Sequence, residues 1–182
     1  MLMGRYELFQ QAYFVNDLDE AIERWSTSFG AGPFVVTNHH QCDKFMYRDT
    51  PQESDVSYAF GYLGDIQVQL IQQHDDTPSI YRDMYGADEE GFHHVATLVH
   101  DFASARQHFL DLGFELACEL FTGGVDAAYF DTRSATGGFT EIHADPPYIL
   151  DTFARWRAAH ANHSPDADPV LDPSIGASRT PA

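Results

Sequence analysis

The sequence contains one pattern twice, about 84 residues apart, and this duplication constrains the fold more than any other feature. In the first copy, Gln10 opens an apolar run that closes at Asp17, and in the second, His94 opens a run that closes at Asp101. Apolar residues at helical spacing follow each aspartate, and a glycine ends each helical segment. Each copy therefore predicts a strand, a helix capped by aspartate and a stop. Because duplicated units usually pack around a pseudo-twofold axis, we expect the polar residues that open the two strands to face a shared cavity.

Turn residues divide the rest of each copy into three further strands. Glycine pairs and polar clusters bound short runs rich in β-branched and aromatic residues. In the first copy, strands are predicted at 9–16, 34–38, 57–63 and 66–72. In the second copy, the helix is predicted at 101–112 and the strands at 92–99, 114–120, 127–131 and 139–143. Residues 39–55 mix polar and aromatic side chains, which fits either a long connection or a strand with a mobile loop.

These elements predict an α+β fold of two tandem βαβββ modules that face a common cavity. The first module is assigned to residues 1–75, a polar linker to 76–91 and the second module to 92–145. Residues 146–161 predict an amphipathic helix, which serves as a lid, packs on the sheet or contributes to a dimer contact. Residues 162–182 contain few large apolar side chains, and we expect them to be a disordered tail.

Composition argues against several classes of partner. The 28 acidic and 10 basic side chains give a net charge of −18, which repels phosphate backbones and anionic headgroups, so neither nucleic acid nor a membrane surface is expected as a partner. No apolar run approaches the roughly 18 residues of a membrane span, and the first residues lack a signal-peptide pattern. A cytoplasmic location is therefore expected. Two reduced thiols at Cys42 and Cys118 are favoured over a single disulfide.

Four polar residues stand among apolar neighbours in strands of the two copies. Gln10 and His94 open the first strand of their copies, whereas Gln69 and Glu141 lie in the last strand. Because side chains alternate between the two faces of a strand, each of the four shares a face with apolar residues. An inward polar group costs free energy unless it has a partner, and an unpaired carboxylate is especially costly. A bound cation would supply that partner.

With its two strand-Asp-helix openings and its endings Gln69-Leu-Ile and Glu141-Ile, the sequence resembles the vicinal oxygen chelate superfamily over residues 8–145. This superfamily includes glyoxalase I, methylmalonyl-CoA epimerase, extradiol dioxygenases and antibiotic-binding proteins. The resemblance implies a curved mixed sheet around a central cavity, in which the first and last strands of both modules surround a divalent metal ion. Carried over by position, it implies four metal ligands: Gln10, Gln69, His94 and Glu141. It also implies a small-molecule substrate and a homodimer.

The site pattern is a hybrid of two members of that superfamily. Methylmalonyl-CoA epimerase resembles it at Gln69, His94 and Glu141 but has histidine where Gln10 stands. Glyoxalase I of the glutamine-containing kind resembles it at Gln10, His94 and Glu141 but has glutamate where Gln69 stands. With one carboxylate in place of two, the site loses one of two possible bases, which argues against glyoxalase chemistry. An extradiol dioxygenase presents two histidines and one carboxylate to iron, whereas these positions offer one histidine.

The donor set also indicates a chemistry by itself. Two amide oxygens, one imidazole and one carboxylate make a mostly hard site for a six-coordinate divalent ion, and Zn, Mn, Co, Ni or Mg all fit. Open coordination positions would bind a substrate carbonyl and stabilise the enolate that forms when the adjacent C–H loses its proton. Glu141 is the candidate base.

The predicted function is therefore a metal-dependent epimerase, isomerase or lyase that acts on a small carbonyl compound or an acyl thioester. The alternative is a non-catalytic protein that binds a hydrophobic or aromatic small molecule on the same fold. An extradiol-type dioxygenase is the third hypothesis.

Residues near the four candidates are given secondary roles. His93 is expected on the opposite face, either at the surface or supporting the ligands. His143 shares the face of Glu141 and is expected at the cavity rim, while Tyr129 is expected in the core. Polar and aromatic residues of the long connection form either a pocket wall or an exposed loop: His39, His40, Asp43 and Tyr47.

Overall fold

The first copy folds into the predicted strand, helix and strands. In the computed structural model, which describes residues 6–164 and 166–171, its elements are β1 (Glu7–Phe14), α1 (Leu18–Phe29), β2 (Val35–Thr37), β3 (Lys44–Tyr47), β4 (Thr50–Pro51), β5 (Val56–Leu63) and β6 (Ile66–Gln73). Asp17 caps α1, because its side chain accepts a hydrogen bond from the Glu20 amide at 2.9 Å. Gly30 ends the helix at φ 73°, a left-handed conformation that glycine adopts without steric cost.

The second copy repeats this order, and a helix follows it. Its elements are β7 (Gly91–Val99), α2 (Phe102–Asp111), β8 (Glu115–Thr122), β9 (Val125–Asp131), α3 (Arg133–Thr136) and β10 (Phe139–Ala144), and the final helix is α4 (Pro147–Ala161). Asp101 caps α2 through the Ser104 amide at 3.0 Å. The sequence did not predict the short α3. Among the described helices, none combines the length and apolar character needed to cross a membrane.

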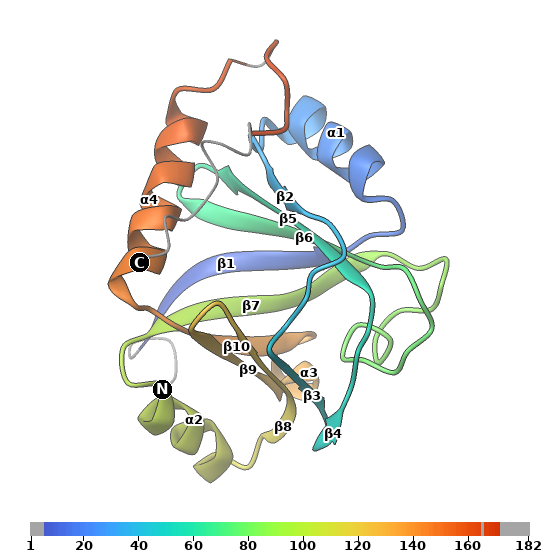
Figure 1. Cartoon of the computed structure of the whole chain (residues 1–182), viewed down its shortest axis with the longest axis vertical. Coiled ribbons are helices and arrows are strands. Elements are labelled where there is room, and N and C mark those ends of the chain that lie inside the picture. Colours follow the sequence, from blue (N-terminus) through green and yellow to red (C-terminus); the bar gives the residue numbers. More distant parts are fainter. Residues whose placement is uncertain (1–5, 165, 172–182) are drawn as a thin grey trace.

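All ten strands form one curled mixed sheet, in the order β2-β5-β6-β1-β7-β10-β9-β8-β3-β4 (Figure 1). The first strands of the two copies, β1 and β7, lie antiparallel at its centre. Each of them runs parallel to the last strand of its own copy, β1 beside β6 and β7 beside β10. Two equivalent half-sheets therefore meet along β1 and β7, which confirms the α+β fold of two βαβββ modules.

The helices and the two faces of the sheet form separate layers. α1 packs on β5 and β6 and covers one apolar cluster, while α2 packs on β9 and β10 and covers a second. Figure 1 shows these two helices at opposite ends of the sheet, with α4 along one side. A third cluster, rich in aromatic side chains, joins residues of both half-sheets on the other face, among them Phe14, Tyr58, Tyr129 and Phe139. The four candidate polar residues belong to this inner face.

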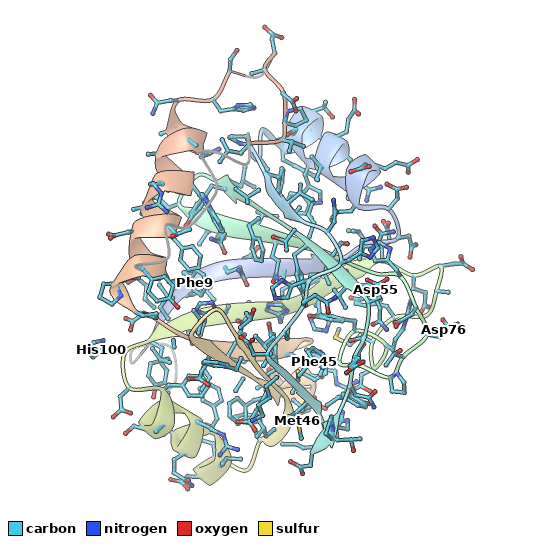
Figure 2. All side chains as sticks on the ribbon, in the orientation of Figure 1. Phe9, Phe45, Met46, Asp55, Asp76 and His100 are labelled. Carbon is cyan, nitrogen blue, oxygen red and sulfur yellow. The ribbon has the colours of Figure 1, made fainter. Side chains whose placement is uncertain are left out.

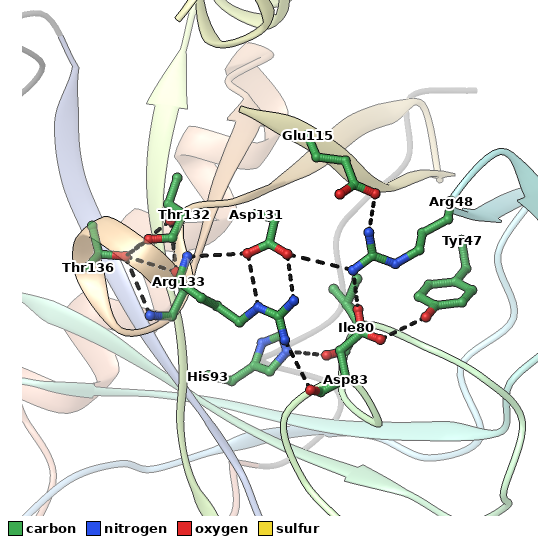
Figure 3. Close-up of polar contacts among 11 residues, drawn as sticks. Tyr47, Arg48, Ile80, Asp83, His93, Glu115, Asp131, Thr132, Arg133 and Thr136 are labelled. Carbon is green, nitrogen blue, oxygen red and sulfur yellow. Dashed lines mark hydrogen bonds and ion pairs between the residues drawn. The ribbon is translucent and has the colours of Figure 1, made fainter. Parts of the chain in front are cut away.

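Residues 39–55, expected as a connection or a strand with a loop, form a hairpin that crosses to the second copy. Its strand β3 pairs antiparallel with β8, so the edge of β8 is covered. Arg48 in the hairpin turn lies with its Nη2 2.7 Å from Asp83 Oδ2 and 3.6 Å from Asp131 Oδ2, and it also pairs with Glu115 (Figure 3). This network ties the hairpin to the segment between the copies and to the second half-sheet.

The polar segment between the copies contributes to the core. Ile80 and Tyr81 are fully buried there. The Tyr81 ring stacks on Phe14 of β1 with ring centroids 6.1 Å apart, and its hydroxyl lies 3.0 Å from the Tyr58 hydroxyl. Burial of these apolar side chains helps to anchor the polar segment against the inner face.

The last described residues pair with the first half-sheet. The Phe34 amide donates to the Pro169 carbonyl at 2.7 Å, and the Leu171 amide donates to the Phe34 carbonyl at 2.8 Å. The disorder expected from residue 162 onward therefore does not hold for 169–171, because Phe34 offers them both backbone partners. Residues 172–182 of the expected tail lie outside the described residues.

Candidate metal centre

The strand registers place two of the four candidate ligands in one row across the sheet. Gln10 on β1 is opposite Ala96 on β7, and Ala96 is opposite Glu141 on β10. Because every second residue of a strand points to the same face, this row brings a polar side chain from each copy to either side of one alanine. The short Ala96 side chain takes up little of the space between the amide and the carboxylate.

A second row is the pseudo-symmetric counterpart of the first. His94 on β7 is opposite Ala12 on β1, and Ala12 is opposite Gln69 on β6. Ala12 and Ala96 are both fully buried, and each lies two residues after the polar residue that opens its copy. The repeat therefore supplies both the candidate ligands and the small residues that lie between them.

The polar atoms of the two rows approach one another in the interior. His94 Nε2 lies 3.0 Å from Glu141 Oε2 and 3.4 Å from Gln10 Oε1. All four candidate residues are at most 5% exposed, and Gln69 opens on the same cavity as Gln10 and Glu141. The structure thus brings the four sequence-predicted residues to one place.

A chain of hydrogen bonds determines which nitrogen of His94 carries hydrogen. His93 Nε2 lies 3.1 Å from the carbonyl oxygen of Ile80, which only accepts, so this nitrogen carries hydrogen (Figure 3). Burial lowers the pKa of both histidines, that of His94 to about 3, so both rings are neutral at pH 7. His93 Nδ1 is then an acceptor, and His94 Nδ1 donates to it at 2.8 Å. His94 Nε2 is left with a lone pair directed at Glu141 and Gln10.

Gln67 orients the Gln10 amide. Gln10 Nε2 donates to Gln67 Oε1 at 2.5 Å, so the Gln10 oxygen turns toward His94. Gln67 is fully buried on β6, directly opposite Gln10 in the parallel register. The sequence pattern assigned Gln67 no role, since the register that pairs it with Gln10 is not visible in the pattern.

Burial also determines the protonation of Glu141. It raises the pKa of this carboxyl from 4.5 to about 7, although nearby His143 and a hydrogen bond with Tyr129 act in the opposite direction. Below pH 7, the protonated carboxyl donates to the lone pair on His94 Nε2 across 3.0 Å. When the carboxyl ionises, two lone pairs face each other.

The donor set fits a divalent cation. Gln69 Oε1 is buried without a hydrogen-bond partner among the described residues, which costs about 1–3 kcal/mol in a metal-free protein. With Glu141 ionised, this oxygen, Gln10 Oε1, His94 Nε2 and Glu141 Oε2 are all acceptors. A cation would satisfy them together, and three oxygens with one imidazole suit a hard or borderline ion.

The candidate centre opens on a cavity of about 280 Å³ that α4 covers. Six aromatic side chains line it: Tyr58, Phe60, Tyr129, Tyr148, Phe153 and Trp156. Phe153 of α4 stacks on Phe9 of β1 with centroids 5.4 Å apart, and Figure 2 shows Phe9 beside this helix. The final helix therefore packs on the sheet as a wall of the cavity.

The neighbouring residues take partly different places from those expected. His93 is not at the surface, because its ring is fully buried against His94, which fits the supporting role. His143 and His40 line the cavity. Tyr47 does not, since its hydroxyl donates to Asp83 at 2.7 Å in the ion-pair network (Figure 3).

A protein-family model agrees with this architecture. The model of the glyoxalase/bleomycin resistance protein/dioxygenase superfamily matches residues 9–130. The chain therefore belongs to this superfamily, which confirms the resemblance seen in the sequence. No curated protein matches the sequence.

Solved structures share the fold at low identity. A hypothetical protein from Bacillus halodurans C-125 is 16% identical with a TM-score of 0.57, over 78% of this chain and 96% of its own. Methylmalonyl-CoA epimerase from Mycobacterium tuberculosis is 19% identical with a TM-score of 0.54, over 79% and 91%. A mutant 4-hydroxymandelate synthase from Streptomyces coelicolor is 15% identical with a TM-score of 0.52, over 77% and 49%. At these identities the likeness establishes the fold alone.

Proposed function

We propose that this chain is a metal-dependent enzyme that removes a proton next to a carbonyl group of a small carbonyl compound or an acyl thioester. One observation carries the proposal: when Glu141 is ionised, more acceptor atoms of four buried residues from both copies face this place than the described donors, Tyr129 among them, can pair. Gln69 Oε1 has no partner among the described residues, and His93 turns the lone pair of His94 Nε2 toward Glu141. A purely structural cluster of buried polar groups would be expected to pair its acceptors with donors.

Gln10, Gln69, His94 and Glu141 would hold the cation. When bound, a divalent ion supplies charge that stabilises the oxygen of a carbonyl as the adjacent carbon loses its proton. The protein's part is to hold the four donors in place. Gln67 orients the Gln10 amide and His93 orients the His94 ring, so two of the donors are fixed by a second residue before any ion binds.

Glu141 is the proposed base. Its carboxyl faces the cavity, and burial raises its pKa to about 7 in the metal-free protein. A bound cation would lower that pKa, so the carboxylate, the form that accepts a proton, would be present at neutral pH. Tyr129, which hydrogen-bonds to Glu141 and also lines the cavity, holds the carboxyl in position. Among the four candidate ligands, Glu141 is the residue with a side chain suited to accept a proton at this pH.

The cavity favours a substrate with an apolar or aromatic part beside its carbonyl group. Its volume of about 280 Å³ suits a small acyl group, and aromatic rings cover much of its wall. Several structures of the same fold are methylmalonyl-CoA epimerases, one of them in complex with methylmalonyl-CoA. This supports a 2-acyl thioester as the first substrate class to test.

The test combines metal analysis of the purified protein with deuterium exchange from solvent into 2-acyl thioesters and thiol-aldehyde adducts. We expect bound divalent metal and exchange at the carbon next to the carbonyl. Glu141→Gln should abolish exchange, and Gln69→Ala should weaken metal binding. Absence of metal and of exchange across the panel would reject the proposal, and tightly bound iron with oxygen uptake on a catechol would favour a dioxygenase.

The aromatic cavity also supports a second candidate, a protein that binds a hydrophobic or aromatic ligand without catalysis. The family name itself includes a resistance protein beside two kinds of enzyme. The two candidates differ in their need for the carboxylate. If Glu141→Ala removed the metal but left ligand affinity and biological activity intact, binding without catalysis would be favoured.

A further inference from the structure

Three side chains of kinds that can ligate metals meet at the surface, away from the candidate centre. His39 follows β2, Asp55 precedes β5 and His74 follows β6, so residues far apart in the sequence come together at one end of the first half-sheet. Each residue offers one potential ligand atom, and these three atoms all lie within 4.8 Å of one another. Figure 2 shows Asp55 where the chain enters β5.

The three side chains are already held toward one another. His39 Nδ1 lies 2.7 Å from Asp55 Oδ1, and the rings of His39 and His74 lie with centroids 4.7 Å apart. The buried hydroxyl of Ser57 contacts both histidines: it lies 2.7 Å from His74 Nε2 and accepts the His39 amide hydrogen at 3.0 Å. The His74 amide donates to the Asp55 carbonyl at 2.8 Å. Both backbone segments are therefore fixed before any ion arrives.

The His39 backbone supports the same interpretation. His39 adopts φ 48°, a left-handed conformation that is uncommon for residues other than glycine and costs free energy. With this backbone conformation, the His39 imidazole lies against Asp55. The side chains of His39 and Asp55 are 62% and 41% exposed, so an ion can reach them from solvent.

We propose that His39, Asp55 and His74 form a second divalent-cation site, with a preference for zinc and similar borderline ions. Two imidazoles and one carboxylate are a common donor set for zinc, with water completing a tetrahedron. Ligands at about 2.0–2.2 Å from a tetrahedral zinc ion lie about 3.3 Å from one another, so small rotations of exposed side chains close the site. The strongly negative net charge of the chain favours cation binding.

Occupation of this site would act on the wall of the central cavity. His40, next to His39, lines that cavity, and its ring contacts Tyr58 with centroids 5.5 Å apart. A cation shared by the three ligands cross-links the segment that carries His40 to the start of β5 and the end of β6. It would therefore hold this part of the wall in one position.

The test is the zinc stoichiometry of the full chain and its variants, measured by equilibrium dialysis and metal analysis. Asparagine tolerates left-handed backbone, so the double variant H39N/H74Q removes both imidazoles with little strain. E141Q replaces the charged donor of the central site by a neutral, weaker one. H100N is the matched control, because His100 also approaches an aspartate, Asp145 at 3.3 Å, but belongs to no three-ligand cluster among the described residues.

We expect two zinc equivalents for the unaltered chain and for H100N, and one each for H39N/H74Q and E141Q. The altered sites should bind at least tenfold more weakly. Zinc should also slow hydrogen exchange of residues 38–43 in E141Q but not in H39N/H74Q. Two equivalents retained by H39N/H74Q, or no zinc bound by E141Q, would overturn the surface site. Failure of the central site has another signature: one equivalent in both the unaltered chain and E141Q, and none in H39N/H74Q.

Discussion

Replacing Glu141 by glutamine is expected to stabilise the metal-free protein above pH 7, although Glu141 is a proposed metal ligand. Burial raises the pKa of Glu141 to about 7 in the fold, whereas its ordinary value is 4.5. Between these pH values the folded state holds a proton that the unfolded chain releases, so stability falls as the pH rises. The stabilisation from the protonated carboxyl is fully present below pH 4.5 and lost above about pH 7. Glutamine does not ionise, and its amide can donate to His94 Nε2.

The size of the effect follows from the two pKa values. One unit of pKa corresponds to about 1.4 kcal/mol, so the raised value corresponds to about 3 kcal/mol. At pH 4.5, Glu141→Gln should change the free energy of unfolding by less than about 0.5 kcal/mol. At pH 8.5, the metal-free variant should be more stable than the unaltered chain by about 3 kcal/mol. Saturating metal should reverse this order, because the unaltered chain then gains the larger binding free energy.

Urea unfolding of chelator-treated protein between pH 4.5 and 8.5 measures this difference. Burial lowers the pKa of His94 to about 3, so its ring is neutral in both folded proteins over this range and its contribution largely cancels. Glu23→Gln on the exposed side of α1 is the matched control, with an expected change below about 0.5 kcal/mol throughout. A difference that does not vary with pH, or a metal-free Glu141→Gln variant less stable than the unaltered chain at pH 8.5, would refute the reasoning.

Three further substitutions test the supports of the site. His93→Phe removes the acceptor for His94 Nδ1, so titration calorimetry should show metal binding weakened about 10- to 100-fold; unchanged affinity would contradict the assigned tautomer. Ala96→Leu fills the space between Gln10 and Glu141 in the first row, so metal binding should be lost. Urea unfolding should show a free energy of unfolding lower by about 1–3 kcal/mol. Retained metal binding would show that the small side chain is not required. Arg48→Ala should lower the free energy of unfolding by about 2 kcal/mol and accelerate hydrogen exchange over 44–51, and slow exchange there would show that the ion pairs do not hold the hairpin.

The sequence was informative where the signal is local or repeated. The caps at Asp17 and Asp101 depend on contacts three residues along the chain, and both are present. Strand alternation placed Gln10 and Glu141 on the inner face. A shift of either strand by one residue would have turned the apolar residues that share this face away from the core. The duplication then supplied the long-range information that two separate half-sheets share one cavity.

Contacts that depend on register or on a single non-local pairing were not predictable. The hairpin around Arg48 joins the second half-sheet through short strands with no strong pattern of their own. Gln67 acts through its position opposite Gln10, which depends on the strand register. His93 acts through a contact with His94, although strand alternation places the side chains of these two neighbours on opposite faces. The cluster at His39 needs three segments whose approach only the folded sheet defines.

The divergence of the two copies determines the charge of the proposed centre. Both amides, Gln10 and Gln69, come from the first copy, whereas both ionisable donors, His94 and Glu141, come from the second. A divalent ion held by one carboxylate and three neutral donors keeps a net charge of about +1, which a second carboxylate would cancel. In a cavity lined by aromatic rings, where charges are poorly screened, that remaining charge favours a substrate oxygen that becomes negative during the reaction. The neutral amides therefore complete the coordination shell without removing the charge that the proposed chemistry needs.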